Sequence, residues 1–209
     1  RGVLLWSAGV TAAVVLAAGL SRRMGQAKLL LPVGGRPLVR HAVEGVRAAG
    51  LDPVLVVTGP DPAAIEAALT GLDVRIVVNP TPEAGQAGSV RAGVAALPAA
   101  VDAVVIALGD QPGLAPDIIP GLLAAHRASG RPIVAPRYQD GAGNPVLFDR
   151  VIFPELLALE GDRGARPVIA RDPTRVEWVA LDRPMPPDVD TPADYEKIRS
   201  ALRPANPPE

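Results

Sequence analysis

Short apolar segments alternate along this chain with longer segments whose apolar residues recur at helical spacing. Four apolar runs are rich in valine, leucine and isoleucine and largely lack polar alternation: residues 12–16, 54–58, 74–78 and 103–108. Such runs are typical of strands buried on both faces, as in a parallel sheet. The helices expected between and after them are residues 37–49, 62–69, 89–97 and 117–129. The pattern predicts a Rossmann-like α/β fold of three layers, with a mostly parallel, twisted sheet and helices on both faces.

The second half of the chain changes this rhythm without introducing a second domain. Further strands are expected at residues 132–136, 145–148 and 176–181, and helices at residues 154–159, 165–171 and 192–202. No linker is long enough to divide two domains, and no internal repeat is present. We therefore expect one domain over residues 12–202, an N-terminal lead-in at 1–11 and a flexible, proline-rich tail at 203–209.

The composition argues against several classes of function. The 209 residues carry a net charge of −1 and only 3% aromatic residues, which gives no basis for binding nucleic acid. The absence of cysteine excludes disulfides and thiolate catalysis, and a reducing cytoplasm is the expected location. The chain has only two histidines, His41 and His126, and both fall in expected helices. These residues give little support for a histidine-based zinc site or a Ser-His-Asp triad.

The uncharged stretch at residues 3–20 admits a second interpretation, as a membrane span or a signal segment. Glycines, a serine and a threonine dilute it, and Val14-Val15-Leu16 is typical of a buried strand. Cleavage after Gly19 would also separate that strand from the loop that follows it. We therefore expect a strand here and no membrane partner.

The loop after the first strand has the character of a phosphate-binding turn. Leu-Ala-Ala-Gly at residues 16–19 is followed within ten residues by two arginines and Lys28. Small residues let backbone N–H groups approach a ligand, and the cations add charge at the same place. Lys28 and Lys197 are the only lysines in this arginine-rich chain. The compact charge of Lys28 suits a phosphate that moves during reaction.

Two aspartates are placed to meet that loop. Asp110 follows the strand expected at residues 103–108, and Asp190 precedes the last helix. Ligands of open α/β sheets bind at the carboxyl ends of strands, and Mg²⁺ favours one or two carboxylates with phosphate oxygens and water. Asp110 and Asp190 are therefore candidate Mg²⁺ ligands. The alternatives are that Asp110 shapes a turn and that Asp190 belongs to a helix cap with Thr191.

Three segments together carry a resemblance to a known family: residues 16–28, Gly-Asp-Gln-Pro at 109–112, and Asp-Val-Asp-Thr-Pro-Ala-Asp-Tyr at 188–195. They resemble the MobA-like molybdenum-cofactor nucleotidyltransferases, and most of all the molybdenum cofactor cytidylyltransferase branch, over residues 14–198. The resemblance implies a Mg²⁺-dependent enzyme that transfers CMP from CTP to the phosphate of a molybdopterin-type substrate and releases pyrophosphate. A molybdoenzyme or its chaperone would receive the product.

The resemblance also implies roles for individual residues. The nucleotide-binding residues would be Leu16, Ala17, Ala18, Gly19, Arg23, Lys28, Asn79, Gly88, Ser89 and Asp110. Arg23 and Lys28 would hold the triphosphate and act with Asp110 in catalysis, whereas Asp110 and Asp190 would hold Mg²⁺. Ala18 favours CTP, because guanylyl relatives usually have glycine there. Guanylyl transfer from GTP is the alternative.

A second-substrate side is implied by residues of the second half: Gly143, Asn144, Pro145, Arg163 and Arg166. Residues 143–145 resemble the Gly-His-Pro segment of the family, with Asn144 in place of histidine, and residues 161–166 match its Gly-Asp-x-Gly-Ala-Arg. Arg163 and Arg166 suit the phosphate of a pterin. The departure at Asn144 leaves another small phosphorylated substrate open.

Two other classes of protein remain as alternatives. An NAD(P)-dependent oxidoreductase also places a loop of small residues after its first strand. Gly-x-Gly-x-x-Gly is absent here, however, and Arg22-Arg23 would crowd a dinucleotide pyrophosphate. A non-catalytic nucleotide-binding protein would not need the paired aspartates.

Overall fold

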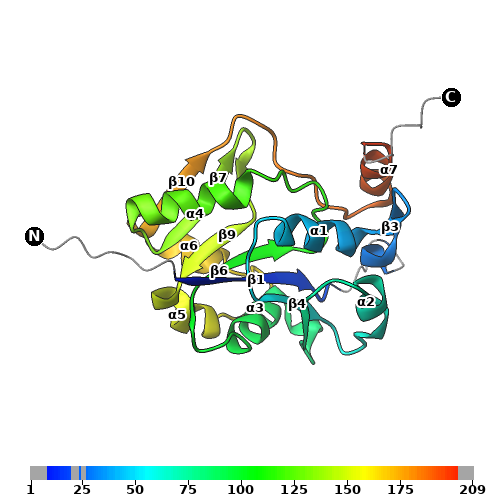
Figure 1. The fold of residues 1–209 in the computed structure, drawn as a ribbon, viewed down its shortest axis with the longest axis horizontal. Coiled ribbons are helices and arrows are strands. Elements are labelled where there is room, and N and C mark those ends of the chain that lie inside the picture. The colour runs from blue at the N-terminus through cyan, green and yellow to red at the C-terminus, as the bar shows by residue number, and fades with distance from the viewer. Residues whose placement is uncertain (1–8, 20–23, 25–26, 202–209) are drawn as a thin grey trace, which may run out of the picture.

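A computed structural model of the chain describes residues 9–19, 24 and 27–201. Its main sheet has eight strands: β1 (Val10–Ala17), β4 (Val54–Thr58), β5 (Arg75–Val78), β6 (Val101–Leu108), β7 (Ile133–Tyr138), β8 (Gly141–Ala142), β9 (Val146–Asp149) and β10 (Val176–Ala180). The strand order is β10-β7-β9-β6-β1-β4-β5, and β8 pairs with β7. Helices lie on both sides of this sheet (Figure 1). The expected α/β architecture with a mostly parallel sheet is confirmed.

Seven α-helices occur in the described residues: α1 (Leu38–Arg47), α2 (Ala63–Ala68), α3 (Gln86–Ala95), α4 (Ile118–Ser129), α5 (Phe153–Leu157), α6 (Arg166–Arg171) and α7 (Pro192–Ala201). A small hairpin of β2 (Pro32–Val33) and β3 (Arg36–Pro37) precedes α1. The helix ends follow local chemistry. For example, α4 stops at Gly130, which adopts a left-handed φ of 64° and donates its N–H to the His126 carbonyl.

One central strand runs against the parallel direction. β9 is antiparallel to both β6 and β7, with Val146 opposite Ile106 and Phe148 opposite Ile133. The connection from β7 to β9 is too short for the helical crossover that parallel neighbours require. The reversed direction of β9 brings the residues before Val146 to the edge of the sheet where β6 ends.

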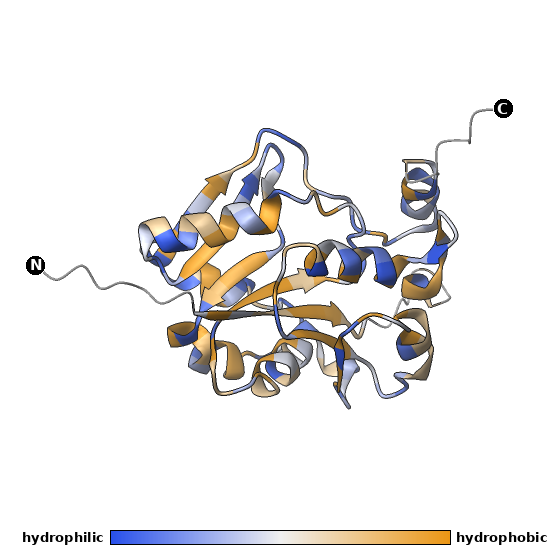
Figure 2. Cartoon of the chain, viewed as in Figure 1, coloured by the Kyte–Doolittle hydropathy of each residue, from blue (hydrophilic) through white to orange (hydrophobic). Residues whose placement is uncertain are grey.

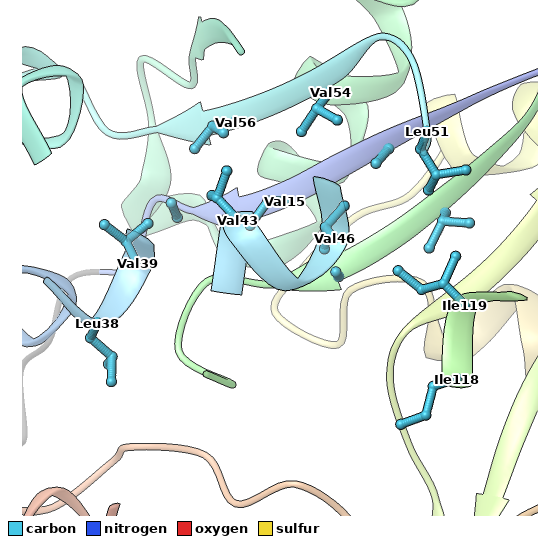
Figure 3. Close-up of a cluster of buried hydrophobic side chains, with 14 of the residues drawn as sticks. Val15, Leu38, Val39, Val43, Val46, Leu51, Val54, Val56, Ile118 and Ile119 are labelled. Atoms are coloured by element: carbon cyan, nitrogen blue, oxygen red, sulfur yellow. The ribbon is translucent and has the colours of Figure 1, made fainter. Parts of the chain in front are cut away.

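Two cores form because successive residues of a strand point to opposite faces. Val15 packs on one face with residues of α1, α2 and α4, and Val14 packs on the other with residues of α3, α5 and α6. Figure 2 shows the central strands mostly in hydrophobic colours, whereas the helices carry both colours. In Figure 3, Val39, Val43 and Val46 of α1 lie over the sheet beside Val15 and Val56. All five of these side chains are at most 1% exposed.

Two expectations about excluded functions bear on the fold. Within the described part of the chain, no helix combines the length and the apolar character that crossing a bilayer requires. His41 lies in α1 with its Nε2 2.7 Å from the Val33 carbonyl oxygen, and His126 lies in α4 with its Nε2 3.3 Å from the Asp149 carboxylate. Both histidines therefore have structural neighbours.

Gly93 in α3 provides a test of how closely this helix packs on the sheet. A Cβ at Gly93 would lie 2.5 Å from Cγ1 of Val14 and 3.1 Å from Cγ2 of Val57. Gly93→Ala is expected to lower the free energy of unfolding by about 1–3 kcal/mol, because overpacking outweighs the better helix propensity of alanine. Chemical denaturation followed by circular dichroism measures this change.

Gly121 in α4 is the matched control for Gly93. A Cβ there meets no atom within 4 Å. Gly121→Ala is therefore expected to stabilise the protein by up to about 1 kcal/mol through helix propensity alone. Equal effects of the two substitutions would contradict the close packing of α3.

Candidate active site

A pocket opens at the carboxyl edge of the sheet, where β1 and β6 end side by side. Leu16 pairs with Leu108 in register, and the N–H of Gly109 donates to the Leu16 carbonyl at 2.9 Å. Its lining includes residues from several parts of the chain: Leu16 of β1, Ala18 and Gly19 after it, Lys28, Asp110, and Gly85, Gln86 and Ser89 around the start of α3. Six of the predicted nucleotide-binding residues thus share one pocket.

Lys28 joins the two predicted metal ligands. Its Nζ donates to Oδ2 of Asp110 at 2.6 Å and to Oδ1 of Asp190 at 2.9 Å. Lys28 begins the 3₁₀ turn η1 (Lys28–Leu30), Asp110 follows β6, and Asp190 precedes α7. Residues that are far apart in the sequence therefore meet at Lys28, which lines the pocket together with Asp110.

The charge of Lys28 is secured by these partners. The residue is only 7% exposed, and this burial disfavours the charged form. The Asp110 and Asp190 carboxylates outweigh the effect of burial and hold the pKa of Lys28 above its ordinary value. Lys28 is therefore an ammonium ion at neutral pH, as a phosphate ligand must be.

Thr191 and Asp194 form a reciprocal pair at the start of α7. The Asp194 carboxylate accepts from the Thr191 N–H at 3.0 Å and from the Thr191 hydroxyl at 2.7 Å, while Thr191 Oγ1 accepts from the Asp194 N–H at 3.2 Å. This reciprocal arrangement satisfies the helix start. The carboxylate of Asp190 accepts from Lys28, as its predicted place beside the phosphate loop requires.

Asn79 and Ser89 form a buried pair beside the pocket. Nδ2 of Asn79 donates to Oγ of Ser89 at 3.0 Å, and the two residues are 2% and 5% exposed. The helix α3 begins at Gln86, three residues before its expected start, so Gly88 and Ser89 lie in its first turn. A Cβ at Gly88 would lie 3.2 Å from Asn79 Nδ2. Glycine at this position therefore leaves room for the Asn79 amide.

Three described residues of the predicted nucleotide-binding set are absent from the pocket lining, namely Ala17 and, beside the pocket, Asn79 and Gly88. The side chain of Ala17 is 5% exposed and belongs to the core that contains Val15, although its neighbours Leu16 and Ala18 line the pocket. Arg23 lies outside the described residues.

The predicted second-substrate segment at residues 143–145 lies at the same edge of the sheet as Asp110, because it immediately precedes β9. The Asn144 carbonyl accepts a hydrogen bond from the Tyr138 hydroxyl at 2.7 Å. Burial raises the pKa of Tyr138 to about 12, so this hydroxyl remains a donor at neutral pH. A Cβ at Gly143 would lie 2.8 Å from Sδ of Met185, so glycine permits close packing here.

The predicted arginines Arg163 and Arg166 lie on the other side of the pocket, next to the start of α3. The Gly161 carbonyl accepts from the Ala87 N–H at 3.0 Å, and Gly85 approaches Gly161 so closely that a Cβ at position 85 would overlap it. Both arginines are exposed. Arg163 of this loop and Arg166 of α6 thus follow a segment that contacts the start of α3, but neither belongs to the pocket lining.

Gln111 and Asp188 belong to this region and were not singled out from the sequence. Nε2 of Gln111 donates to Oδ1 of Asp188 at 2.7 Å, and Gln111 is 6% exposed. Burial and the Asp110 and Asp190 carboxylates raise the pKa of Asp188, whereas Gln111 and Lys28 oppose this shift. Gln111 lies in the Gly-Asp-Gln-Pro motif at 109–112, and Asp188 begins the motif at 188–195. The sequence feature that could have indicated a role for Gln111 is its neutral amide directly after Asp110.

A model of the MobA-like NTP transferase domain matches residues 13–176, which is most of the chain. The protein belongs to the MobA-like NTP transferase family. It is thus a nucleotidyltransferase, and the matched region contains Lys28 and Asp110 together with the second-substrate segments. Asp190 lies beyond the end of the match.

Similar proteins in this MobA-like family carry diverse names. Nicotine blue oxidoreductase of Paenarthrobacter nicotinovorans is 34% identical over 187 residues, covering 85% of this chain and 91% of that protein. Purine catabolism protein PucB of Bacillus subtilis is 33% identical over 199 residues, covering 90% and 96%. The crystal structure of Rv0371c from Mycobacterium tuberculosis superposes with a TM-score of 0.82 at 33% identity, covering 93% of this chain and 100% of that one. Rv0371c has also been crystallised in complex with manganese.

The donor set of this MobA-like site fits a hard divalent cation. Asp110 and Asp190 supply carboxylate oxygens close enough together to share one ammonium group. Across the described residues, no group of three or more acidic, histidine or cysteine side chains could hold a metal ion. Two carboxylates completed by phosphate oxygens and water are the coordination that Mg²⁺ commonly adopts with nucleotides.

Proposed function

We propose that this protein transfers CMP from CTP to the terminal phosphate of a molybdopterin-type acceptor in the cytoplasm. An acceptor phosphate oxygen attacks the α-phosphorus, the bond between that phosphorus and the bridging oxygen to the β-phosphate breaks, and pyrophosphate leaves. A molybdoenzyme or its chaperone would receive the product. The observation that carries the proposal is that Lys28, which lines a pocket with Ala18, Gly19 and Asp110, donates to both Asp110 and Asp190.

The residues have separate tasks in this reaction. Lys28 and Arg23 bind the triphosphate and offset the charge that develops on the leaving pyrophosphate. Asp110 and Asp190 would hold Mg²⁺, which when bound neutralises phosphate charge. No general base is required because the attacking phosphate is already an anion. Positioning and electrostatics therefore supply most of the acceleration.

Specificity is assigned to two sets of residues. Ala18 lines the pocket, and its methyl group would narrow the space for the base, which supports CTP over GTP. The segment at 143–145, with Arg163 and Arg166, would hold the anionic acceptor. The manganese complex of Rv0371c supports a divalent metal in this family.

A nucleotide panel tests the proposed substrate. CTP with Mg²⁺ is expected to raise the melting temperature more than GTP, ATP or UTP, because a ligand that binds only the folded state stabilises it by mass action. A preference for GTP would transfer the assignment to guanylyl transfer. The absence of any shift with all four nucleotides, in Mg²⁺ or Mn²⁺, would overturn nucleotide binding at this pocket.

A second candidate function rests on the name of one relative, nicotine blue oxidoreductase. An oxidoreductase would bind a nicotinamide dinucleotide and would change its absorbance when mixed with an acceptor. Pyrophosphate release from CTP and a molybdopterin-type acceptor, without oxidation of NADPH, is the outcome expected here. Oxidation of NADPH without pyrophosphate release would favour the second function.

A further inference from the structure

Asp190 is carried by a segment that has no regular structure of its own. Residues 181–191 connect β10 to α7 across the carboxyl edge of the sheet. The first part of this connection is held by β7 and the turn after it: the Gln139 N–H donates to the Arg183 carbonyl at 3.1 Å, and the Met185 N–H donates to the Asp140 carboxylate at 2.9 Å. The position of Asp190 therefore depends on the contacts of the second part of the connection, residues 186–190.

That second part is held by the turn after β6. The Val189 N–H donates to the Asp110 carbonyl at 3.2 Å, and the Val189 side chain is fully buried. Gln111 adds two contacts from one side chain, because its Nε2 donates to Oδ1 of Asp188 at 2.7 Å and to the Pro186 carbonyl at 3.4 Å. The amide thus joins the turn that carries Asp110 to the segment that carries Asp190.

A neutral donor is the residue type that this position requires. Asp188 lies two residues before Asp190 and contacts the residue after Asp110, so it adds to the negative charge of the Asp110 and Asp190 carboxylates. A cationic partner for Asp188 would compete with Lys28 for these carboxylates, and an acidic residue would add repulsion. The glutamine amide binds Asp188 without changing the charge of the site.

We infer that Gln111 is a positioning residue, which fixes the distance between Asp110 and Asp190 by holding the 186–190 segment through Asp188 and Pro186. Gln111 touches no substrate in this assignment. It acts on the affinity of the two carboxylates for a divalent metal, and this inference rests on the proposed function of that pair. Supporting groups of this kind commonly change metal affinity by about 10–100-fold when they are replaced.

Gln111→Glu tests this role because glutamate has nearly the same shape but cannot donate to Asp188. We expect the dissociation constant for Mn²⁺, titrated with and without CTP and followed by electron paramagnetic resonance, to rise by about 10–100-fold. In pyrophosphate release, the metal concentration at half-maximal rate should rise in parallel, while kcat at saturating metal changes much less. Loss of kcat alone would contradict the inference.

Gln139→Glu is the matched control, because Gln139 also donates through Nε2 to an aspartate of the same connection, Asp182 at 2.8 Å, but at the exposed end. It should leave Mn²⁺ binding unchanged. The double variant Gln111→Glu with Asp188→Asn reverses donor and acceptor without changing net charge, and should recover most of the lost affinity. Equal weakening by Gln139→Glu, or no recovery in the double variant, would overturn the role of Gln111.

These measurements separate the inference from the proposed function. Mn²⁺ binding can be measured without turnover. A protein that released no pyrophosphate would therefore refute the proposed reaction. The comparison of Gln111→Glu with Gln139→Glu would still decide whether Gln111 positions the two carboxylates. If Gln111→Glu does not fold, Gln111→Leu removes the donor without adding charge. Gln139→Leu then serves as its control, with the same outcomes expected.

Discussion

Asp110→Ala is expected to lower the rate of pyrophosphate release by about a hundredfold or more, which corresponds to about 3 kcal/mol in the barrier. Two losses combine in this variant. One carboxylate of the metal-binding pair disappears, and Lys28 loses its 2.6 Å ion pair with Asp110. The measurement is a coupled pyrophosphate assay with CTP, Mg²⁺ and a molybdopterin-type acceptor, performed at saturating metal.

Asp182→Ala is the control for Asp110→Ala. Asp182 is an exposed aspartate of the connection between β10 and α7, and its carboxylate accepts only from the Gln139 side chain at 2.8 Å among the hydrogen bonds of the described residues. Its removal should leave the rate close to that of the wild type. An Asp110→Ala variant that folds and retains activity within about threefold of the wild type would defeat the metal role of this carboxylate.

The regular part of the fold could be predicted because its causes are local. The valine-rich run at residues 54–58 gives β4 with the predicted bounds, and the helix expected at 117–129 ends at Ser129 before a glycine. The direction of β9 was missed, although the short interval after β7 already excluded a helical crossover. The length of that interval, and not the hydrophobic pattern, predicts an antiparallel β9, and so predicts that residues 143–145 lie at the same edge of the sheet as Asp110.

The candidate site was predictable in its residues but not in their pairing. Lys28 stood out as a rare lysine, and Asp110 and Asp190 as acids near ends of elements, yet 82 and 162 residues separate Lys28 from these two aspartates. Which atoms meet depends on strand order and on the course of an irregular connection. For the same reason the Gln111–Asp188 contact, which joins two quoted motifs, was not foreseen.

Lys28→Met is expected to lower both the rate of the reaction and the stability of the protein. The rate of pyrophosphate release should fall by about a hundredfold or more, because the triphosphate loses a buried cation. The free energy of unfolding without metal should fall by about 1–3 kcal/mol, since Asp110 and Asp190 lose their shared partner. This is less than for fully buried charges because the two carboxylate side chains remain 21% and 34% exposed.

The response of this variant to Mn²⁺ distinguishes its mechanism from simple destabilisation. The ammonium group and a divalent cation would bind the same two carboxylates, so removing the ammonium removes a competitor for the metal. Saturating Mn²⁺ should therefore raise the melting temperature of Lys28→Met by more than it raises that of the wild type. Thermal denaturation with increasing Mn²⁺, in the absence of nucleotide, measures this difference directly.

Lys197→Met provides the comparison, because it removes the other lysine with the same change of side chain. Lys197 is 78% exposed and lies 3.9 Å from Asp194, so its ion pair contributes little. Its rate, stability and response to Mn²⁺ should match the wild type. If Mn²⁺ stabilises Lys28→Met no more than Lys197→Met, then Lys28 and the metal do not share Asp110 and Asp190, and the carboxylates must be assigned another task.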